Sequence, residues 1–383
     1  MRVLVATTAG EGHFGPLVPF ARSLIDAGHE VRVAAPASFS PVVGRAGLEH
    51  APFADAPPEE LGAVFARVPE LPRMEANATV IREVFGRLDT RAGLPGVQEI
   101  VESWRPDLVL REPAEFASYV VADALGVPHV QVAIGLTTLD EFMVSAVDEP
   151  LREFGCASGV AGLRAAPRLT SVPGRLDTEP VQGTAETHRF RSPDLLSDPV
   201  ALPSWWPDDS LPLVYVSFGS VTGRLATFGD LYQGAVSALA DLPVRVLLTV
   251  GDAVDPVALA PLPPNVHVER WWPQQEVMPH ASAMVGHGGF GTTMLGLAAG
   301  VPMVVLPLFS YDQFLNAARV QEVGAGSALE DGAPAVAALG GAVQRLLGDP
   351  SYAVVARQLA QDIAELPPAA ASVPLLEQVG AAG

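Results

Sequence analysis

The sequence predicts an α/β protein made of two Rossmann-like domains, each a doubly wound parallel sheet, that face each other across a cleft. Its 383 residues exceed the roughly 250–300 that one hydrophobic core usually serves. Strand and helix patterns alternate in both halves, which is typical of parallel sheets covered on both faces. A proline-rich segment, 192–212, separates the halves as an extended linker. The predicted divisions are domains at 1–200 and 201–365 and a tail of unassigned role at 366–383.

The first half contains five apolar runs that predict strands. They are Arg2–Thr7, Val31–Ala35, Leu108–Arg111, Val130–Ile134 and Arg168–Val172. The first helix is signalled clearly, since Leu17, Phe20 and Leu24 recur on one helical face. Pro16 suits its first turn and Gly28 its end.

The second half repeats the alternation and contains the most informative motif of the chain. Its predicted strands are Leu213–Phe218, Val244–Val250, Val266–Glu269, Ala281–Val285, Met303–Leu306 and Gly326–Leu329. The fourth of these strands breaks into four glycines around His287, and a helix is expected to open at about Thr292. Backbone N–H groups of such a loop, together with the helix N-terminus, can hold a phosphate or diphosphate.

Composition excludes several classes of function. The formal net charge of −20 argues against a nucleic-acid partner, which needs clustered Lys and Arg. Cys156 is the single cysteine, so no internal disulfide forms, as in a reducing compartment. The sequence predicts no membrane span, no signal peptide and no metal site, so we expect a cytoplasmic protein.

A dinucleotide enzyme is an alternative, because both glycine turns, 10–15 and 286–291, fit the G-x-G-x-x-G fingerprint. That fingerprint requires an acidic residue at the end of the next strand to hold the ribose. No acidic residue ends the next strand after either turn, since these strands are Val31-Arg-Val-Ala-Ala-Pro36 and Val304-Val-Leu-Pro307. We therefore expect no nicotinamide or flavin cofactor.

Several motifs together resemble the family 1 glycosyltransferases of GT-B fold, particularly the actinobacterial natural-product type, over nearly the whole chain. The matching segments are Gly12-His13-Phe-Gly-Pro16-Leu-Val-Pro19, Val216-Ser-Phe-Gly-Ser220, Arg270-Trp-Trp-Pro-Gln274, His287-Gly-Gly-Phe-Gly-Thr292, Gly300-Val-Pro302-Met-Val and Pro307-Leu-Phe-Ser-Tyr-Asp312-Gln313. The resemblance implies a carboxyl-terminal domain that binds a nucleotide-sugar and an amino-terminal domain that binds the acceptor. It also implies inversion of the anomeric centre without a metal.

Two residues are predicted to be catalytic. His13, in the loop that enters the first helix, would deprotonate the acceptor hydroxyl, and the helix N-terminus would keep its ring neutral. Such a histidine is usually oriented by a carboxylate. Glu112 lies just after the predicted strand Leu108–Arg111, at the place where the family more often has Asp after its fourth strand, whereas Asp107 at the start of the strand is the alternative.

The resemblance also assigns the donor site. Trp271 would stack on the base, Ser217 and Ser220 would bind the diphosphate, and Asp312 and Gln313 would read the sugar hydroxyls. The full predicted donor set is Ser217, Gly219, Ser220, Trp271, Gln274, His287, Gly288, Gly289, Gly291, Thr292, Asp312 and Gln313.

The acceptor is expected to be a small apolar aglycone, bound by Phe14, Phe53, Phe65, Phe85 and Phe116. The donor is expected to be a dTDP-sugar whose sugar is a deoxysugar. Family members that use UDP-sugars commonly have Glu eight residues after the loop histidine, where this chain has Leu295. A leucine leaves a ribose 2′-hydroxyl without a partner.

Three points stay open at the level of sequence. A GT-B-like nucleotide-sugar epimerase or hydrolase would use acidic catalytic residues in place of His13. A non-catalytic auxiliary protein of a glycosyltransferase would be expected to lose the base or the phosphate loop. The sequence is also compatible with a homodimer.

Overall fold

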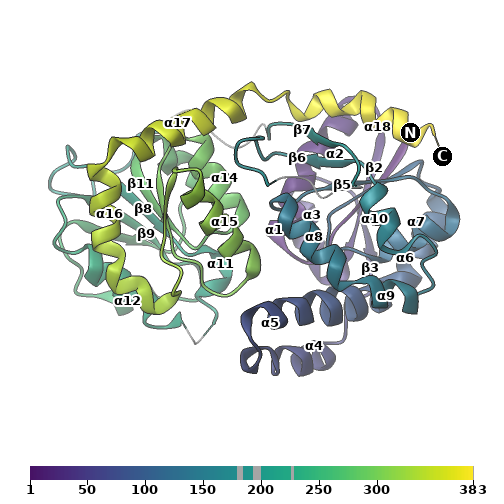
Figure 1. Cartoon of the computed structure of the whole chain (residues 1–383), viewed down its shortest axis with the longest axis horizontal. Coiled ribbons are helices and arrows are strands. Elements are labelled where there is room, and N and C mark those ends of the chain that lie inside the picture. Colours follow the sequence, from purple (N-terminus) through teal and green to yellow (C-terminus); the bar gives the residue numbers. More distant parts are fainter. Residues whose placement is uncertain (179–183, 193–199, 226–227, 383) are drawn as a thin grey trace. The chain divides into compact units, whose positions relative to one another are not determined.

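The computed structural model describes residues 1–178, 184–192, 200–225 and 228–382, so 193–199 of the predicted linker lie outside the described residues. The chain divides into two compact units. The amino-terminal unit comprises Met1–Val172, Asp177–Pro193 and Leu366–Gly383, and the carboxyl-terminal unit comprises Pro173–Leu176 and Asp194–Glu365. Each unit is built on a parallel sheet, as the sequence predicts (Figure 1).

The amino-terminal sheet has the order β3-β2-β1-β4-β5-β6-β7 among the described residues, with every neighbouring pair parallel. The strands are β1 Arg2–Ala6, β2 Glu30–Pro36, β3 His50–Phe53, β4 Leu108–Arg111, β5 His129–Val132, β6 Arg168–Thr170 and β7 Thr187–Arg189. The sequence analysis missed β3 and β7. Both are short edge strands, and Pro52 is tolerated in β3 because an edge strand needs fewer ladder hydrogen bonds.

Helices cover both faces of this sheet. They are α1 Glu11–Phe14, α2 Val18–Asp26, α3 Ser40–Arg45, α4 Pro58–Phe65, α5 Arg73–Thr79, α6 Thr90–Trp104, α7 Ala117–Leu125, α8 Thr137–Ala146, α9 Asp148–Glu153, α10 Gly159–Ala165 and α18 Val373–Gly380. A π-helical stretch, η4 Val80–Asp89, joins α5 to α6. The predicted first helix is observed as α1, a 3₁₀ turn at Gly15–Leu17, and α2, which ends before Gly28 at φ +87°.

The tail acquires a structural role that its composition did not reveal. Ala369, Val373 and Leu376 are buried in the amino-terminal core beside residues of β1, α2 and β4. Figure 1 shows α18, in yellow, close to both marked chain ends. Residues 366–382 thus complete the amino-terminal unit.

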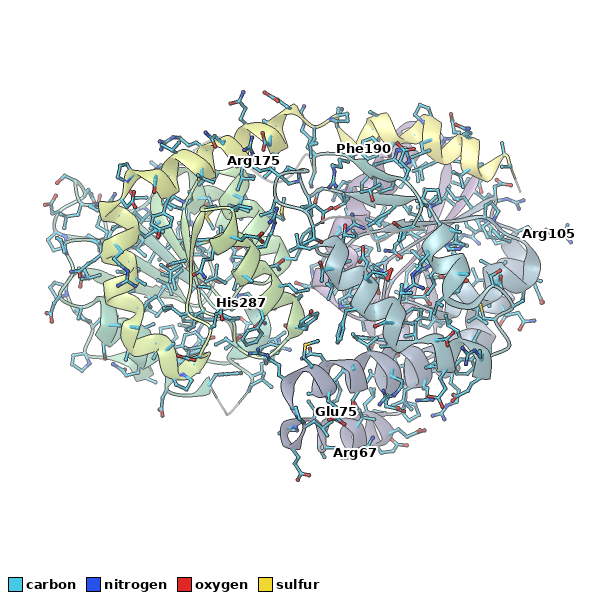
Figure 2. The ribbon with its side chains drawn as sticks, viewed as in Figure 1. Arg67, Glu75, Arg105, Arg175, Phe190 and His287 are labelled. Carbon is cyan, nitrogen blue, oxygen red and sulfur yellow. The ribbon has the colours of Figure 1, made fainter. Side chains whose placement is uncertain are left out.

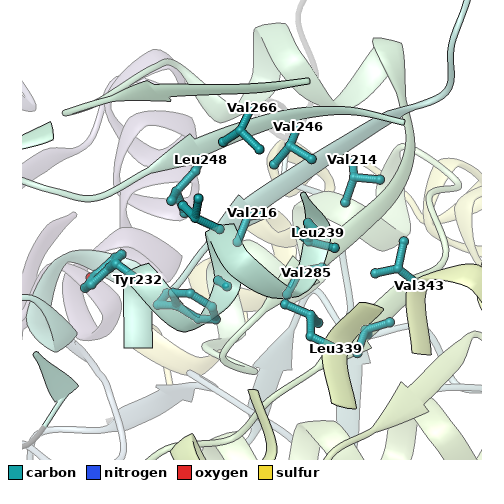
Figure 3. Close-up of a cluster of buried hydrophobic side chains, with 14 of the residues drawn as sticks. Val214, Val216, Tyr232, Leu239, Val246, Leu248, Val266, Val285, Leu339 and Val343 are labelled. Atoms are coloured by element: carbon teal, nitrogen blue, oxygen red, sulfur yellow. The ribbon is translucent and has the colours of Figure 1, made fainter. Parts of the chain in front are cut away.

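The carboxyl-terminal sheet has the order β10-β9-β8-β11-β12-β13, also parallel throughout its described part. The strands are β8 Leu213–Ser217, β9 Arg245–Thr249, β10 Val266–Glu269, β11 Ala281–Gly286, β12 Met303–Val305 and β13 Gly326–Ala328. The main helices are α11 Gly219–Thr222, α12 Leu231–Leu239, α13 Gln274–Val277, α14 Phe290–Ala298, α15 Tyr311–Glu322, α16 Leu339–Gly348 and α17 Pro350–Glu365. Figure 3 shows β-branched and leucine side chains of the sheet packed against Leu239, Leu339 and Val343 from the helices.

Candidate active site

Glu112 lies in the first turn after β4, at the carboxyl end of the amino-terminal sheet. Its side chain is fully buried, and its carboxylate accepts three hydrogen bonds. Oε1 accepts from the backbone N–H of Thr8 at 3.2 Å and from its hydroxyl at 3.0 Å, and Oε2 accepts from the N–H of Ala114 at 2.6 Å. Nδ1 of His13 lies 3.2 Å from the same Oε1, an ion-pair contact when the ring is protonated. The carboxylate is therefore held in one orientation.

His13 lies in the short helix α1, not in a loop as expected from the sequence. Its side chain is 24% exposed, so one edge of the ring is open to solvent. Gly10 permits this placement, because a Cβ there would stand 2.9 Å from Cδ2 of His13. With Nδ1 directed at Glu112, the general-base role expected of His13 would fall to Nε2.

The pKa of Glu112 reflects two opposing influences. Burial alone would raise it, but the neighbouring His13 and the N–H donors of Ala114 and Thr8 bring the pKa of Glu112 below its usual range. Glu115, buried three residues on, differs: burial raises its pKa despite hydrogen bonds from Ser118. The pKa values of these two buried carboxyls are thus displaced in opposite directions.

Asp107, the alternative partner, lies at the start of β4, where Oδ2 accepts from the N–H of Arg2 at 2.7 Å. It is at the opposite end of the strand from Glu112. The structure thus places Glu112, and not Asp107, against His13.

The five predicted acceptor phenylalanines have different surroundings. Phe85 lies beside His13, with ring centroids 5.6 Å apart. Phe53 and Phe116 line a small pocket together with Thr8 and Asp89. Phe14 is buried against Phe39, and Phe65 is 49% exposed on α4.

Asp89 and Thr8 were not foreseen from the sequence. Asp89 ends the π-helical stretch η4, and a carboxylate in a long mixed segment carries no sequence signal of its own. Burial, followed by the charges of Glu112 and Glu115, raises the pKa of Asp89 to about 7, against a smaller opposing effect of His13. Thr8 could have been found, because it directly follows the strand that leads to the glycine turn.

The glycine loop of the carboxyl-terminal unit runs from the end of β11 into α14. The helix begins at Phe290, two residues earlier than expected, so Gly291 and Thr292 form part of its first turn. The ring of His287 (Figure 2) fits closely against Gly219 and Gly289, where an added Cβ would stand 2.7 Å and 2.5 Å from it. Gly219 also has φ +78°, which favours glycine.

His287 is a neutral donor or acceptor in this setting. Burial lowers the pKa of His287 to about 4, against a smaller opposing effect of the Ser217 backbone. A neutral imidazole can donate one hydrogen bond to a phosphate oxygen without adding a charge. Anion binding here would therefore depend on N–H groups and the N-terminus of α14.

Asn316 and Gln313, both buried on α15, hold the backbone around this loop. Asn316 donates from Nδ2 to the carbonyl oxygen of Gly288 at 2.7 Å. Gln313 accepts at Oε1 from the N–H groups of Leu308 and Phe309, at 2.8 and 3.2 Å. Asp312 is half-buried in the first turn of the same helix.

The remaining predicted donor residues lie near the ends of β8 and β10. Trp271 is 70% exposed, which leaves its ring free to stack, whereas Trp272 packs edge-on against Trp205. Gln274 donates to the hydroxyl of Ser217 at 3.3 Å, and Ser220 is exposed on α11. Leu295, the position of the expected donor preference, is 8% exposed on α14.

Within the described ranges, no group of three or more metal-ligating side chains could hold a metal ion. None of the described helices is both long enough and apolar enough to cross a membrane.

Comparison with known proteins agrees with this geometry over both units. Residues 22–160 match the model of the amino-terminal domain of erythromycin biosynthesis protein CIII-like proteins, and residues 234–379 match that of the carboxyl-terminal domain. The L-demethylnoviosyl transferase of Streptomyces niveus is 32% identical, over 96% of this chain and 95% of that protein. The chain belongs to this family of natural-product glycosyltransferases. It is accordingly an enzyme that transfers sugars, with the GT-B fold.

Two further relatives of this glycosyltransferase extend the comparison. The elloramycin glycosyltransferase ElmGT of Streptomyces olivaceus is 33% identical, over 96% of this chain and 94% of that protein. The solved structure of the spinosyn rhamnosyltransferase SpnG complexed with thymidine diphosphate is 25% identical, with a TM-score of 0.78 over 98% of this chain and all of that one.

Proposed function

We propose that this glycosyltransferase moves a deoxysugar from a dTDP-sugar to a hydroxyl of a small apolar natural-product aglycone, with inversion and without a metal ion. The observation that carries the proposal is the contact between His13 and Glu112. A histidine with one nitrogen on a buried carboxylate and one edge open to solvent is arranged as a general base.

The proposed reaction is a single displacement. The acceptor oxygen forms a bond to the anomeric carbon while Nε2 of His13 takes its proton. The bond from that carbon to the diphosphate oxygen breaks, and dTDP leaves with the electron pair. Attack opposite to the leaving group inverts the anomeric centre.

The donor assignment has separate support. Leu295 offers no hydrogen bond to a ribose 2′-hydroxyl, which a deoxyribose lacks. The spinosyn rhamnosyltransferase relative is described in complex with thymidine diphosphate. The loop N–H groups, His287 and the N-terminus of α14 would stabilise the leaving diphosphate in place of a metal ion.

The test is acceptor-dependent consumption of a dTDP-sugar by the purified protein, followed for the wild type, His13→Ala and His29→Ala. His29 is the matched control, because its ring contacts Glu377 away from the site. We expect His13→Ala to lose transfer by about 10²–10⁴-fold, while its Kd for dTDP stays within a few-fold. Transfer that survives within about tenfold would show that His13 is not the base. Donor consumption without any acceptor would favour a hydrolase or epimerase instead.

A further inference from the structure

Arg111, the last residue of β4, is one of the largest fully buried side chains in the described part of the chain. It lies in register between Ala6 of β1 and Gln131 of β5. A buried guanidinium costs free energy unless its donors are satisfied, so its partners indicate what it does.

The partners of Arg111 are mainly the backbone of the segment that follows it. Its Nη1 atom donates to the carbonyl oxygen of Glu112 at 2.7 Å and to that of Glu115 at 3.2 Å. Its Nη2 atom donates to Oε1 of Gln131 at 3.3 Å. One nitrogen therefore joins both ends of the four-residue turn that carries Glu112.

Aromatic rings and other ionisable groups enclose the same guanidinium. Its Cζ atom lies 5.5 Å from the ring centroid of Tyr119 and 6.0 Å from that of Phe116. The charged or titratable groups that act on it are Glu112, Glu115, Tyr119 on α7, His129 on β5 and Asp140 on α8. The two aromatic rings and the three hydrogen-bond acceptors together restrict the orientation of the Arg111 guanidinium.

We propose that Arg111 is a positioning residue, which fixes the 112–115 turn through the carbonyl oxygens of Glu112 and Glu115 and so aims the Glu112 carboxylate at Nδ1 of His13. The inference rests on the proposed function of His13 and adds a residue that touches no substrate. Arginine suits the task, because its planar fork can serve two carbonyl oxygens and Gln131 at once, whereas lysine presents a single ammonium on a flexible stem.

The test is the tautomer of His13, read from ¹⁵N NMR at a pH where the ring is neutral. The His13 signals among the eight histidines are assigned by their loss in His13→Asn. In the wild type we expect the proton on Nδ1, facing Glu112. In Arg111→Met we expect the Nδ1–H form to fall to a minority, because the 112–115 turn then loses the hydrogen bonds that fix its two carbonyl oxygens and can carry the carboxylate away from Nδ1. Arg111→Lys should fall between these two.

Arg168 provides the matched control. It is also a buried arginine of the amino-terminal unit, but it pairs with Asp140 and Asp177. Arg168→Met and Arg168→Lys should lose stability and keep the wild-type His13 spectrum. If Arg111→Met does not fold, the comparison of the His13 spectra of Arg111→Lys and Arg168→Lys tests the inference by itself. A His13 spectrum in Arg111→Lys or Arg111→Met equal to that of the wild type would overturn the inference.

Failure of this inference and failure of the proposed function are distinguishable. The NMR comparison needs no substrate, so it reports on Arg111 whether or not transfer is observed. If His13→Ala loses activity but the Arg111 variants keep the wild-type His13 spectrum, the proposed function is supported and the positioning role of Arg111 is refuted.

Discussion

Asn316 on α15 and Gly288 in the glycine loop are joined by a buried side chain-to-backbone hydrogen bond of 2.7 Å. An added Cβ on Gly288 would stand 2.6 Å from the carbonyl oxygen of Gln313, so the loop and this helix are also in close steric contact. The loop that we expect to bind the diphosphate therefore depends on a residue that the sequence motifs do not include.

Replacing Asn316 with leucine should weaken dTDP binding by roughly tenfold, because a buried carbonyl without its partner costs about 1–3 kcal/mol. The measurement is the Kd for dTDP by calorimetry. Asn265→Leu is the matched control, since Asn265 bonds the carbonyl oxygens of Leu239 and Leu242 away from the loop. Equal losses in the two variants would mean that Asn316 acts through general stability alone.

Glu112→Gln should slow transfer by about 10²-fold or more, because the amide cannot stabilise the imidazolium that forms on His13. Asp107→Asn should leave kcat nearly unchanged, since Asp107 bonds the N–H of Arg2 at the far end of β4. Steady-state kinetics of the two variants give the comparison. A larger loss in Asp107→Asn would reassign the carboxylate partner.

Leu295→Glu should move donor preference toward UDP-sugars. The unmodified enzyme should prefer dTDP-glucose to UDP-glucose by up to about 10²-fold, since an apolar site rejects an added hydroxyl only to that extent. The kcat/KM values for both donors with one acceptor measure the change. A wild type that prefers UDP, or a variant whose preference does not move, would contradict the assignment.

Strong chelation should leave activity unchanged, because loop N–H groups and neutral His287 are expected to bind the leaving diphosphate. Initial rates with and without EDTA are the measurement. A large loss with EDTA that Mg²⁺ or Mn²⁺ restores would show that the enzyme needs a metal ion.

The two buried histidines should each destabilise the fold as the pH is lowered from about 7 toward 5, whereas Asp89, whose pKa is raised to about 7, acts in the opposite direction over that range. Burial, followed by the charge of Arg111, lowers the pKa of His129 to about 3, and burial lowers that of His287 to about 4. In the unfolded chain both rings take up protons near pH 6.5, so below that pH the unfolded state binds more protons and is favoured. Relative to the wild type, the urea midpoint of His129→Gln should therefore rise as the pH is lowered through this range, because the variant lacks the His129 contribution. A difference in urea midpoint between the variant and the wild type that does not change with pH would refute the lowered pKa of His129.

The sheets of both units were largely predictable, because central strands such as β1, β4 and β8 are buried runs rich in Val and Leu. The edge strands β3 and β7 were not, since half-exposed segments such as Thr187–Arg189 carry no apolar pattern. The contact of Glu112 with His13 was predictable from strand polarity, because both follow the carboxyl ends of parallel strands.

The supporting residues of the site were beyond the sequence. In the sequence, Arg111 is an ordinary charged residue at the end of a predicted strand. Only its three hydrogen-bond acceptors in the structure indicate that it holds the turn after the strand. Asp89 reaches the neighbourhood of Glu112 through a π-helical stretch, and the period of the sequence does not distinguish such a stretch from an α-helix. Contacts between segments distant in sequence leave no local pattern.

The return of residues 369–376 to the amino-terminal core has a consequence for the order of synthesis. Most of the unit that contains His13 is translated first, yet its core stays open until residues 369–376 have left the ribosome. The carboxyl-terminal unit, made in between, can close around its own sheet earlier. A nascent chain of this enzyme can therefore complete its carboxyl-terminal unit before its amino-terminal unit.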